Sequence, residues 1–280
     1  MSADSPSAGG PASLTPHLER VRGPRGPVGY ERWGAAGAPL LLLAGLGSCA
    51  RLWGDLPRLL ARRFTVLAPD NRGVGRSREG EPFTLAGAAE DAALVIGHAG
   101  FQSAAVLGVS MGGLIACHLA GTRPGQVSRL VAASCGASLT SSHRRVLRFF
   151  ELCLTRMAPA EAAASLMTFT FAPGFADRYP GFVDQAAALW APDPDDVPGA
   201  LAQVRHLAEG WDLRQVAAAV TCPTLVLAGQ LDPLVPVAAT RDLAATIPGA
   251  RCREVPGAAH SVLAEGGPAL LDEVLEFLAP

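Results

Sequence analysis

The stretch Ser103-Ala104-Ala105-Val106-Leu107-Gly108-Val109-Ser110-Met111-Gly112-Gly113-Leu114-Ile115-Ala116 decides how the rest of the chain is interpreted. Apolar residues lead into a Gly-x-Ser-x-Gly pentapeptide, and small residues compatible with a helix follow it. A strand that turns sharply into a helix in this way lifts its serine, here Ser110, above the edge of a sheet. Gly108 and Gly112 stand where the folded-back backbone leaves no room for a Cβ atom. The pentapeptide alone also fits a flexible loop, so the remaining sequence has to supply the partners of a reactive serine.

Composition limits the classes of partner. The chain has 280 residues, of which 49% are hydrophobic and 17% charged, so it can bury a large core. Its net charge of −2 offers no basic surface, and we therefore expect neither nucleic acid nor membrane as a partner. All 23 basic residues are arginine, which excludes a Schiff-base lysine and a Ser–Lys dyad.

The cysteines and the N-terminus suggest a compartment. The six cysteines are scattered, form no Cys-x-x-Cys pair and in several cases lie in apolar runs, so we expect buried free thiols in a reducing environment. No apolar run approaches the ~18 residues of a membrane span. Residues 1–16 lack the basic and apolar regions of a signal peptide. These features predict a soluble cytoplasmic protein. The sequence leaves open whether it is a monomer or a homodimer.

Strand-like and helix-like segments alternate along most of the chain. Residues 1–26 are rich in Ser, Pro, Gly and Ala and are expected to be flexible. Strands are expected near 28–33, 39–44, 64–70, 103–109, 127–133, 221–228 and 251–255, and helices near 53–63, 84–98, 111–116, 238–246 and 268–278. Such alternation predicts an α/β fold with a mostly parallel, doubly wound sheet and right-handed crossovers.

One interval breaks the alternation. Residues 139–214 contain no strand-like run, only helical stretches rich in Phe, Met, Leu and Trp. We interpret this interval as a helical lid inserted between two strands of the sheet. The core then comprises residues 27–138 and 215–280.

The later strands supply partners for Ser110. A serine needs a base to take its proton, and the base needs a third group to fix its tautomer. In a fold of this kind the acid and the histidine follow late strands, in the order Ser, Asp or Glu, His. Asp232 follows the strand near 221–228, and His260 follows the strand near 251–255. Each residue alone also fits a non-catalytic role: Asp232 could initiate a turn beside Pro233, and His260 could be an exposed loop residue.

The same layout indicates where an oxyanion would be bound. A tetrahedral intermediate needs two N–H donors, and the residue after the nucleophile, Met111, supplies one. The turn after the strand near 39–44 supplies the other from Leu46, which follows Gly45.

The aromatic residues of the lid fit either packing onto the core or the lining of an apolar pocket. The candidate pocket residues are Gly45, Phe171, Phe175, Trp190 and His206.

Neither a cofactor nor a metal is expected. Gly73-Val74-Gly75 begins like a dinucleotide-binding fingerprint, but Arg78 stands at its third glycine position. We therefore assign Asp70 and Arg72 to tying loops together. The remaining histidines, His98, His118, His143 and His206, show no metal-ligand spacing and are interpreted as structural or exposed.

Taken together, these motifs resemble the α/β-hydrolase superfamily over roughly residues 27–278. The motifs are Gly45-Leu46-Gly47, Asp70-Asn71-Arg72-Gly73-x-Gly75-x-Ser77, Gly108-Val109-Ser110-Met111-Gly112-Gly113, Gly229-x-x-Asp232-x-x-x-Pro236 and His260. Segments 171–175 and 211–214 are similar to the 3-oxoadipate enol-lactonase and carboxylesterase-like branch. That branch commonly has His or Asn where Ala44 stands here. The resemblance implies an α/β-hydrolase fold with a Ser110–His260–Asp232 triad.

Three functional hypotheses follow. The first is serine-dependent hydrolysis of a largely apolar small-molecule ester or lactone through an acyl-enzyme. The second keeps the triad but passes the acyl group, from a free or carrier-bound substrate, to another acceptor, or catalyses elimination or cyclisation. The third is a non-catalytic binding protein on the same fold.

Overall fold

The computed structural model of the protein describes residues 15–280, and residues 1–14 of the expected flexible segment lie outside the described range. The rest of that segment is not loosely attached. His17–Gly23 forms strand β1, which pairs antiparallel with β2 (Gly26–Trp33). This strand has no signal in the sequence because β1 is an edge strand with charged, exposed residues, and only Val21 of it is buried.

The strands form one sheet of eight in the order β1-β2-β4-β3-β5-β6-β7-β8. The pairs of β1 with β2 and of β2 with β4 are antiparallel, and all other pairs are parallel. The remaining strands are β3 (Ala38–Leu43), β4 (Phe64–Pro69), β5 (Ala104–Val109), β6 (Val127–Ala133), β7 (Thr224–Gly229) and β8 (Arg251–Val255). The mostly parallel sheet expected from the sequence is confirmed.

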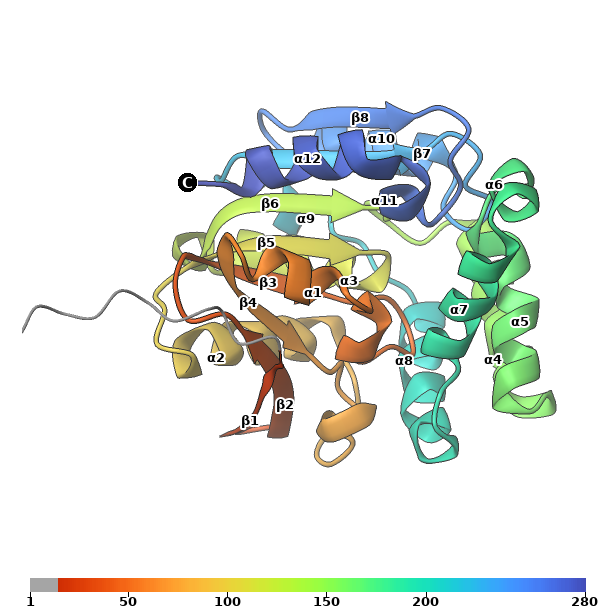
Figure 1. The fold of residues 1–280 in the computed structure, drawn as a ribbon, viewed down its shortest axis with the longest axis horizontal. Helices are drawn as coiled ribbons and strands as arrows, with labels where there is room; N and C mark the ends of the chain where they lie inside the picture. Colours follow the sequence, from red (N-terminus) through yellow and green to blue (C-terminus); the bar gives the residue numbers. More distant parts are fainter. Residues whose placement is uncertain (1–14) are drawn as a thin grey trace, which may run out of the picture.

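Helices cover both faces of this sheet (Figure 1). On β3, Leu41 and Leu43 pack into one apolar cluster, and Leu40 and Leu42 pack into the other. This is why β3 is a continuous apolar run rather than an alternating one. One face carries α2 (Leu85–His98), α3 (Met111–Thr122), α9 (Arg214–Ala217) and α10 (Val237–Thr246), and the other carries α1 (Leu56–Leu60), α11 (Val262–Glu265) and α12 (Gly267–Leu278).

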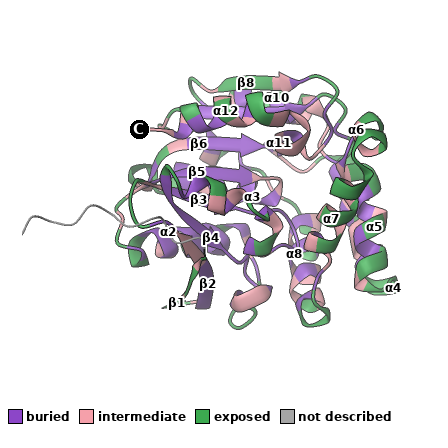
Figure 2. Cartoon of the chain, viewed as in Figure 1, coloured by how far each residue is buried: buried purple, intermediate pink, exposed green. Residues whose placement is uncertain are grey.

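Six α-helices lie between β6 and β7 in the sequence, and we call the first five of them, with their connections, the lid. They are α4 (Ser141–Arg156), α5 (Pro159–Thr170), α6 (Pro173–Arg178), α7 (Pro180–Trp190) and α8 (Val197–Glu209). Figure 1 shows them beyond the carboxyl ends of the parallel strands. Figure 2 shows buried central strands, while much of the lid surface is exposed. Between residues 139 and 214 the structure has no strand, only an isolated bridge of Ser138 with Asp212.

Short helical turns occupy several connections. They are η1 (Ala50–Trp53), η2 (Gly75–Ser77), η3 (Pro124–Gln126) and η4 (Pro194–Asp196). The single helix expected near 53–63 is instead η1 followed by α1, because Gly54 adopts a φ of 52° between them. The Thr84 cap is confirmed, since its side chain accepts a hydrogen bond from Gly87 N at the start of α2.

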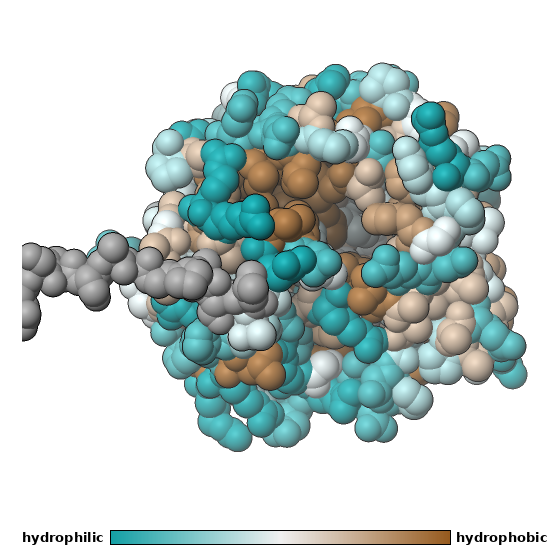
Figure 3. All heavy atoms as spheres, viewed as in Figure 1, coloured by the Kyte–Doolittle hydropathy of each residue, from teal (hydrophilic) through white to brown (hydrophobic). Residues whose placement is uncertain are grey.

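The outer surface of the molecule is mixed in polarity. Figure 3 shows apolar residues gathered between α1 and α12 within hydrophilic surroundings.

Within residues 15–280, every helix is too short or too polar to cross a lipid bilayer. Of the six cysteines, Cys117, Cys135 and Cys153 are buried free thiols, as the sequence predicts, but Cys252 is exposed.

A buried ion pair fixes the loop after β4 to α2. Arg72 donates from Nε and Nη2 to the two Asp91 carboxylate oxygens, at 2.7 and 2.6 Å. Its Nη1 also donates to the Arg25 carbonyl at 2.8 Å, in the turn between β1 and β2. The Arg72 side chain is only 1% exposed, so this bidentate contact is largely out of water. The tying role predicted for Arg72 therefore extends to three separate segments.

We predict that Arg72→Met lowers the free energy of unfolding by about 3 kcal/mol or more, because it leaves the Asp91 carboxylate buried without its partner. Denaturant unfolding followed by circular dichroism measures the change. Arg241→Met, which removes an exposed pair with Glu254, is the matched control and should have little effect. Equal losses in the two variants would contradict the prediction.

Candidate functional site

Ser110 lies at the tight turn between β5 and α3. Its φ of 54° and ψ of −121° are unusual for a residue with a side chain. Its backbone N–H donates to the Ala133 carbonyl of β6 at 2.8 Å. A Cβ atom added at Gly108 would lie 2.3 Å from the Gly112 oxygen, and one added at Gly112 would lie 2.0 Å from the Leu43 oxygen. The expectation that these two positions require glycine is confirmed.

Asp232 and His260 meet at the same edge of the sheet. The loops after β7 and β8 bring His260 Nδ1 to 2.8 Å from Asp232 Oδ2. The other carboxylate oxygen, Oδ1, accepts hydrogen bonds from the backbone N–H groups of Leu234 and Val235, at 2.9 Å each. These contacts fix the carboxylate, which holds Nδ1 of His260 and leaves Nε2 available to another partner.

The electrostatic surroundings of His260 favour its protonated form. Burial is the largest influence and lowers its pKa, but the nearby Asp232 charge and hydrogen bond, with a smaller effect of Glu265, outweigh burial and raise the pKa above its ordinary value. A raised pKa makes the imidazole a stronger base. Ser110 Oγ forms no hydrogen bond within residues 15–280, although Ser110 and His260 line one cavity.

Three contacts hold the backbone around His260. Ser134 Oγ donates to the His260 carbonyl at 2.7 Å, and Ser261 N donates to the Thr170 carbonyl of the lid at 2.9 Å. Glu265 accepts from Ala259 N at 2.7 Å and from Ala172 N of the lid at 2.6 Å. Burial raises the pKa of Glu265. The sequence analysis did not identify Glu265, whose only signal is its place shortly after His260.

The turn after β3 presents Leu46, the predicted oxyanion donor, and is held by buried amides. Asn71 Nδ2 donates to the Ala44 and Gly45 carbonyls at 3.1 and 2.9 Å. Gln203 of the lid accepts from Gly47 N at 2.7 Å and donates to the Arg72 carbonyl at 2.9 Å. No protein acceptor within residues 15–280 takes the backbone N–H of Leu46 or that of Met111.

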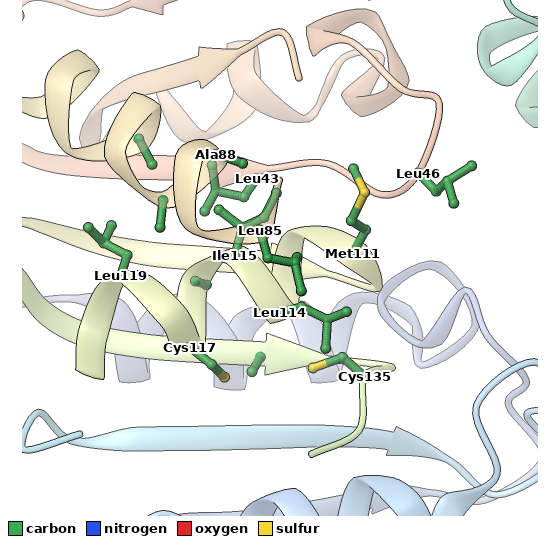
Figure 4. Close-up of a cluster of buried hydrophobic side chains, with 14 of the residues drawn as sticks. Leu43, Leu46, Leu85, Ala88, Met111, Leu114, Ile115, Cys117, Leu119 and Cys135 are labelled. Atoms are coloured by element: carbon green, nitrogen blue, oxygen red, sulfur yellow. The ribbon is translucent and has the colours of Figure 1, made fainter. Parts of the chain in front are cut away.

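Figure 4 shows the side chains of the two residues predicted to supply these donors. The side chains of Leu46 and Met111 stand at one end of a buried apolar cluster that continues through Leu114 and Ile115 of α3. Met111 is 2% exposed and Leu46 is 8% exposed. Burying these side chains fixes the backbone on which the two N–H groups lie.

A cavity opens beside Ser110. It holds about 540 Å³ of empty space, counting its open mouth. Its lining is apolar apart from a few hydroxyl groups and two imidazoles, and no Arg, Asp or Glu contributes to it. The lining residues are Leu46, Ser110, Met111, Leu114, Ser134, Cys135, Gly136, His143, Val146, Leu147, Phe150, Leu207, Trp211, Leu234, Val235 and His260.

The lid residues predicted for the pocket lie elsewhere in this structure. Phe171 and Phe175 stack with ring centroids 5.5 Å apart, and Trp190 Nε1 donates to the Leu46 carbonyl at 3.0 Å. His206 Nε2 accepts from Leu85 N at 3.2 Å. Gly45 faces Ser110, since a Cβ atom added there would lie 3.5 Å from the Ser110 Cβ. Contact of these residues with substrate stays a prediction.

One of the lining residues is a histidine that the sequence led us to interpret as structural or exposed. His143, in the first turn of α4, is only 4% exposed and lines the cavity with Ser110 and His260. Burial is the main cause that lowers its pKa.

Within residues 15–280, no group of three or more His, Cys, Asp or Glu side chains is arranged to hold a metal ion.

We predict that Gln203→Leu loosens the turn that presents Leu46, because the Gly47 N–H and the Arg72 carbonyl then lose their partner in a buried place. Each unpaired group costs about 1–3 kcal/mol, so the free energy of unfolding should fall by at least about 2 kcal/mol. Hydrogen exchange should also accelerate in residues 44–50. Gln102→Leu, at an exposed position, is the control. Unchanged exchange in the Gln203 variant would contradict the prediction.

Comparison with known proteins places this geometry in a family. The family described as "alpha/beta hydrolase fold" matches residues 38–267. The protein named "Putative carbamate hydrolase RutD" from Azorhizobium caulinodans is 31% identical over 236 residues, which cover 83% of this chain and 87% of the relative.

Solved structures agree. A hydrolase from Pseudomonas aeruginosa PA01 superposes with a TM-score of 0.80 at 31% identity, covering 94% of this chain and 98% of that one. An enol-lactonase from Burkholderia xenovorans LB400 has a TM-score of 0.80 at 23% identity, covering 96% and 99%, and it supports the fold alone. The chain therefore belongs to the α/β-hydrolase family and is a hydrolase of that fold.

Proposed function

We propose that the protein hydrolyses a small, largely apolar ester or lactone through an acyl-enzyme formed on Ser110. The observation that carries this proposal is one cavity that contains Ser110, on a strained turn, and His260, held 2.8 Å from the Asp232 carboxylate. A non-catalytic binding protein would not need a serine on a strained turn beside a histidine–carboxylate pair, because such backbone strain costs stability.

In the first step, Ser110 Oγ attacks the substrate carbonyl carbon while His260 Nε2 takes the hydroxyl proton. The Asp232 carboxylate keeps the proton of the resting imidazole on Nδ1 and stabilises the imidazolium that forms. The N–H groups of Leu46 and Met111 donate to the developing oxyanion. Ser110 and His260 need no hydrogen bond before substrate binds, because such contacts often tighten only in the complex.

In the second step, the tetrahedral intermediate collapses and the alkoxide leaving group takes the proton from His260. Water then attacks the acyl-enzyme, with His260 as the base, and Ser110 leaves with that proton. A free acid and Ser110 in its initial state result. His260 thus carries a proton from Ser110 to the leaving group in the first half of the reaction and from water to Ser110 in the second half.

The cavity supports an uncharged substrate. Its lining has no cationic or carboxylate side chain, and burying an unpaired charge there would cost several kcal/mol.

A carbamate is a second candidate, because a carbamate-hydrolase relative is 31% identical over 83% of this chain. Carbamates need the same nucleophile, base and oxyanion donors as esters.

We also propose that the protein works in a reducing, cytoplasmic environment. All six of its cysteines are free, and three of them are buried in the core. Free thiols of this number persist where cellular reductants keep disulfides from forming.

We predict that Ser110→Ala lowers kcat/KM for 4-nitrophenyl esters by about 10⁴-fold or more, since no other group can form the acyl-enzyme. Labelling by a fluorophosphonate probe should disappear as well. Ser128→Ala, at an exposed position at the opposite end of the sheet, should keep both properties. Wild-type turnover rates in the Ser110 variant would refute the proposal.

The fate of the acyl group distinguishes hydrolysis from acyl transfer, elimination and cyclisation. Products are analysed by mass spectrometry in water alone, with added alcohols, and with an acyl group on a carrier thiol. The proposal requires the free acid as the main product in all three reactions. A transferred, dehydrated or cyclised acyl product in place of the acid would favour the alternative.

The raised pKa of His260 has a consequence for the pH dependence of kcat/KM. The neutral imidazole is the active base, so activity should fall as the pH decreases through a pKa above 6.5. In Asp232→Asn the raising influence is lost and burial remains, so the acidic limb should move to lower pH. The rate itself should fall by about 10⁴-fold. A pH–rate profile with the same acidic limb in both proteins would contradict this account.

A further inference from the structure

The second imidazole in the cavity, that of His143, is held by its Nδ1 atom. Thr140 N donates to Nδ1 at 3.2 Å, while His143 N donates to Thr140 Oγ1 at 3.2 Å, and together they cap α4. Because a backbone N–H can only donate, Nδ1 is an acceptor. The proton of the neutral ring is therefore on Nε2.

That Nε2–H group has no partner. It is buried and forms no hydrogen bond within the described part of the chain, and the His143 residue as a whole is 4% exposed. The ring lines the cavity that also contains Ser110 and His260, and the Trp211 ring lies 5.5 Å from it. Since buried donors are nearly always paired, an unpaired one that lines a substrate cavity indicates an acceptor on the ligand.

The charge state of His143 defines the acceptor. Burial, the largest influence, lowers the pKa of this imidazole, with the His260 charge acting in the same direction and the Ser138 carbonyl and Asp232 charge acting against it. The ring is therefore neutral at pH 7. No arginine lines the cavity to pair with an anion, so the matching group is an uncharged oxygen.

We propose that His143 is a specificity-determining residue whose Nε2–H donates a hydrogen bond to a second, uncharged oxygen of the substrate, separate from the scissile carbonyl. The preferred substrates are then esters, lactones or carbamates that carry a further ether, hydroxyl or carbonyl oxygen. This inference rests on the proposed hydrolysis at Ser110 and adds to it the choice of substrate.

The test compares esters that differ by one atom. A series of 4-nitrophenyl esters is prepared in which an ether oxygen replaces one methylene group of the acyl chain, at a different position in each ester. The kcat/KM of each ester is compared with that of the ester whose acyl chain is all carbon. A neutral hydrogen bond is worth about 1 kcal/mol, or roughly five- to tenfold in kcat/KM. The wild-type protein should prefer the oxygen-containing ester by this factor at one or two positions.

Variants assign the preference to one nitrogen atom. His143→Leu should abolish it, and His143→Gln, whose amide N–H reaches near the Nε2 position, should keep most of it. His143→Asn places its amide near Nδ1 and should lose the preference even if the Leu variant does not fold. His118→Leu is the matched control, because His118 also has an unpartnered ring nitrogen but lies outside the cavity.

The outcomes separate the two proposals. Turnover that depends on Ser110 but shows no preference for any oxygen-containing ester overturns the role of His143 alone. A preference that survives in both the Leu and the Asn variants also overturns it. Turnover that does not depend on Ser110 overturns the proposed function itself.

Discussion

The structure depends on one close approach, in which the start of α3 packs directly against the backbone of β3. A Cβ atom at Gly112 would lie 2.0 Å from the Leu43 oxygen, so glycine permits an approach that no other residue allows. The Ser110 N–H bonded to Ala133 of β6 fixes the turn from the other side. Strands β3, β5 and β6 are adjacent and parallel, and their order therefore sets the height and direction of the Ser110 side chain.

The lid is part of the same constraint because polar side chains bond it to the turns of the core. Gln203 bonds the Gly47 N–H, Trp190 bonds the Leu46 carbonyl, and Glu265 bonds both Ala172 of the lid and Ala259 beside His260. Apart from the bond between Glu265 and Ala259, these contacts join segments far apart in the sequence. A displacement of the lid helices would therefore reach both the turn that carries Leu46 and the loop that carries His260.

The sequence predicts those parts of the molecule that local chemistry determines. Strand 127–133, the elbow glycines and the Thr84 cap follow from apolar runs, steric limits and capping rules. Strand β1 was missed because an edge strand with charged residues lacks an apolar pattern. Gln203 and His143 had no signal, since their roles arise from contacts across more than one element. The aromatic residues predicted to line the pocket do not line the cavity, and Phe171 and Phe175 pack against each other.

The two imidazoles of the cavity show how one apolar site can support two different tasks. Burial lowers the pKa of both rings, but only His260 has a carboxylate within hydrogen-bond distance, and its pKa is raised as a result. His143 bonds a backbone N–H instead, which fixes a neutral ring with its proton on Nε2. One ring is thus suited to accept a proton and the other to donate a hydrogen bond without ionising. The difference comes from a single partner atom at each Nδ1, since the solvent exclusion of the cavity is common to both.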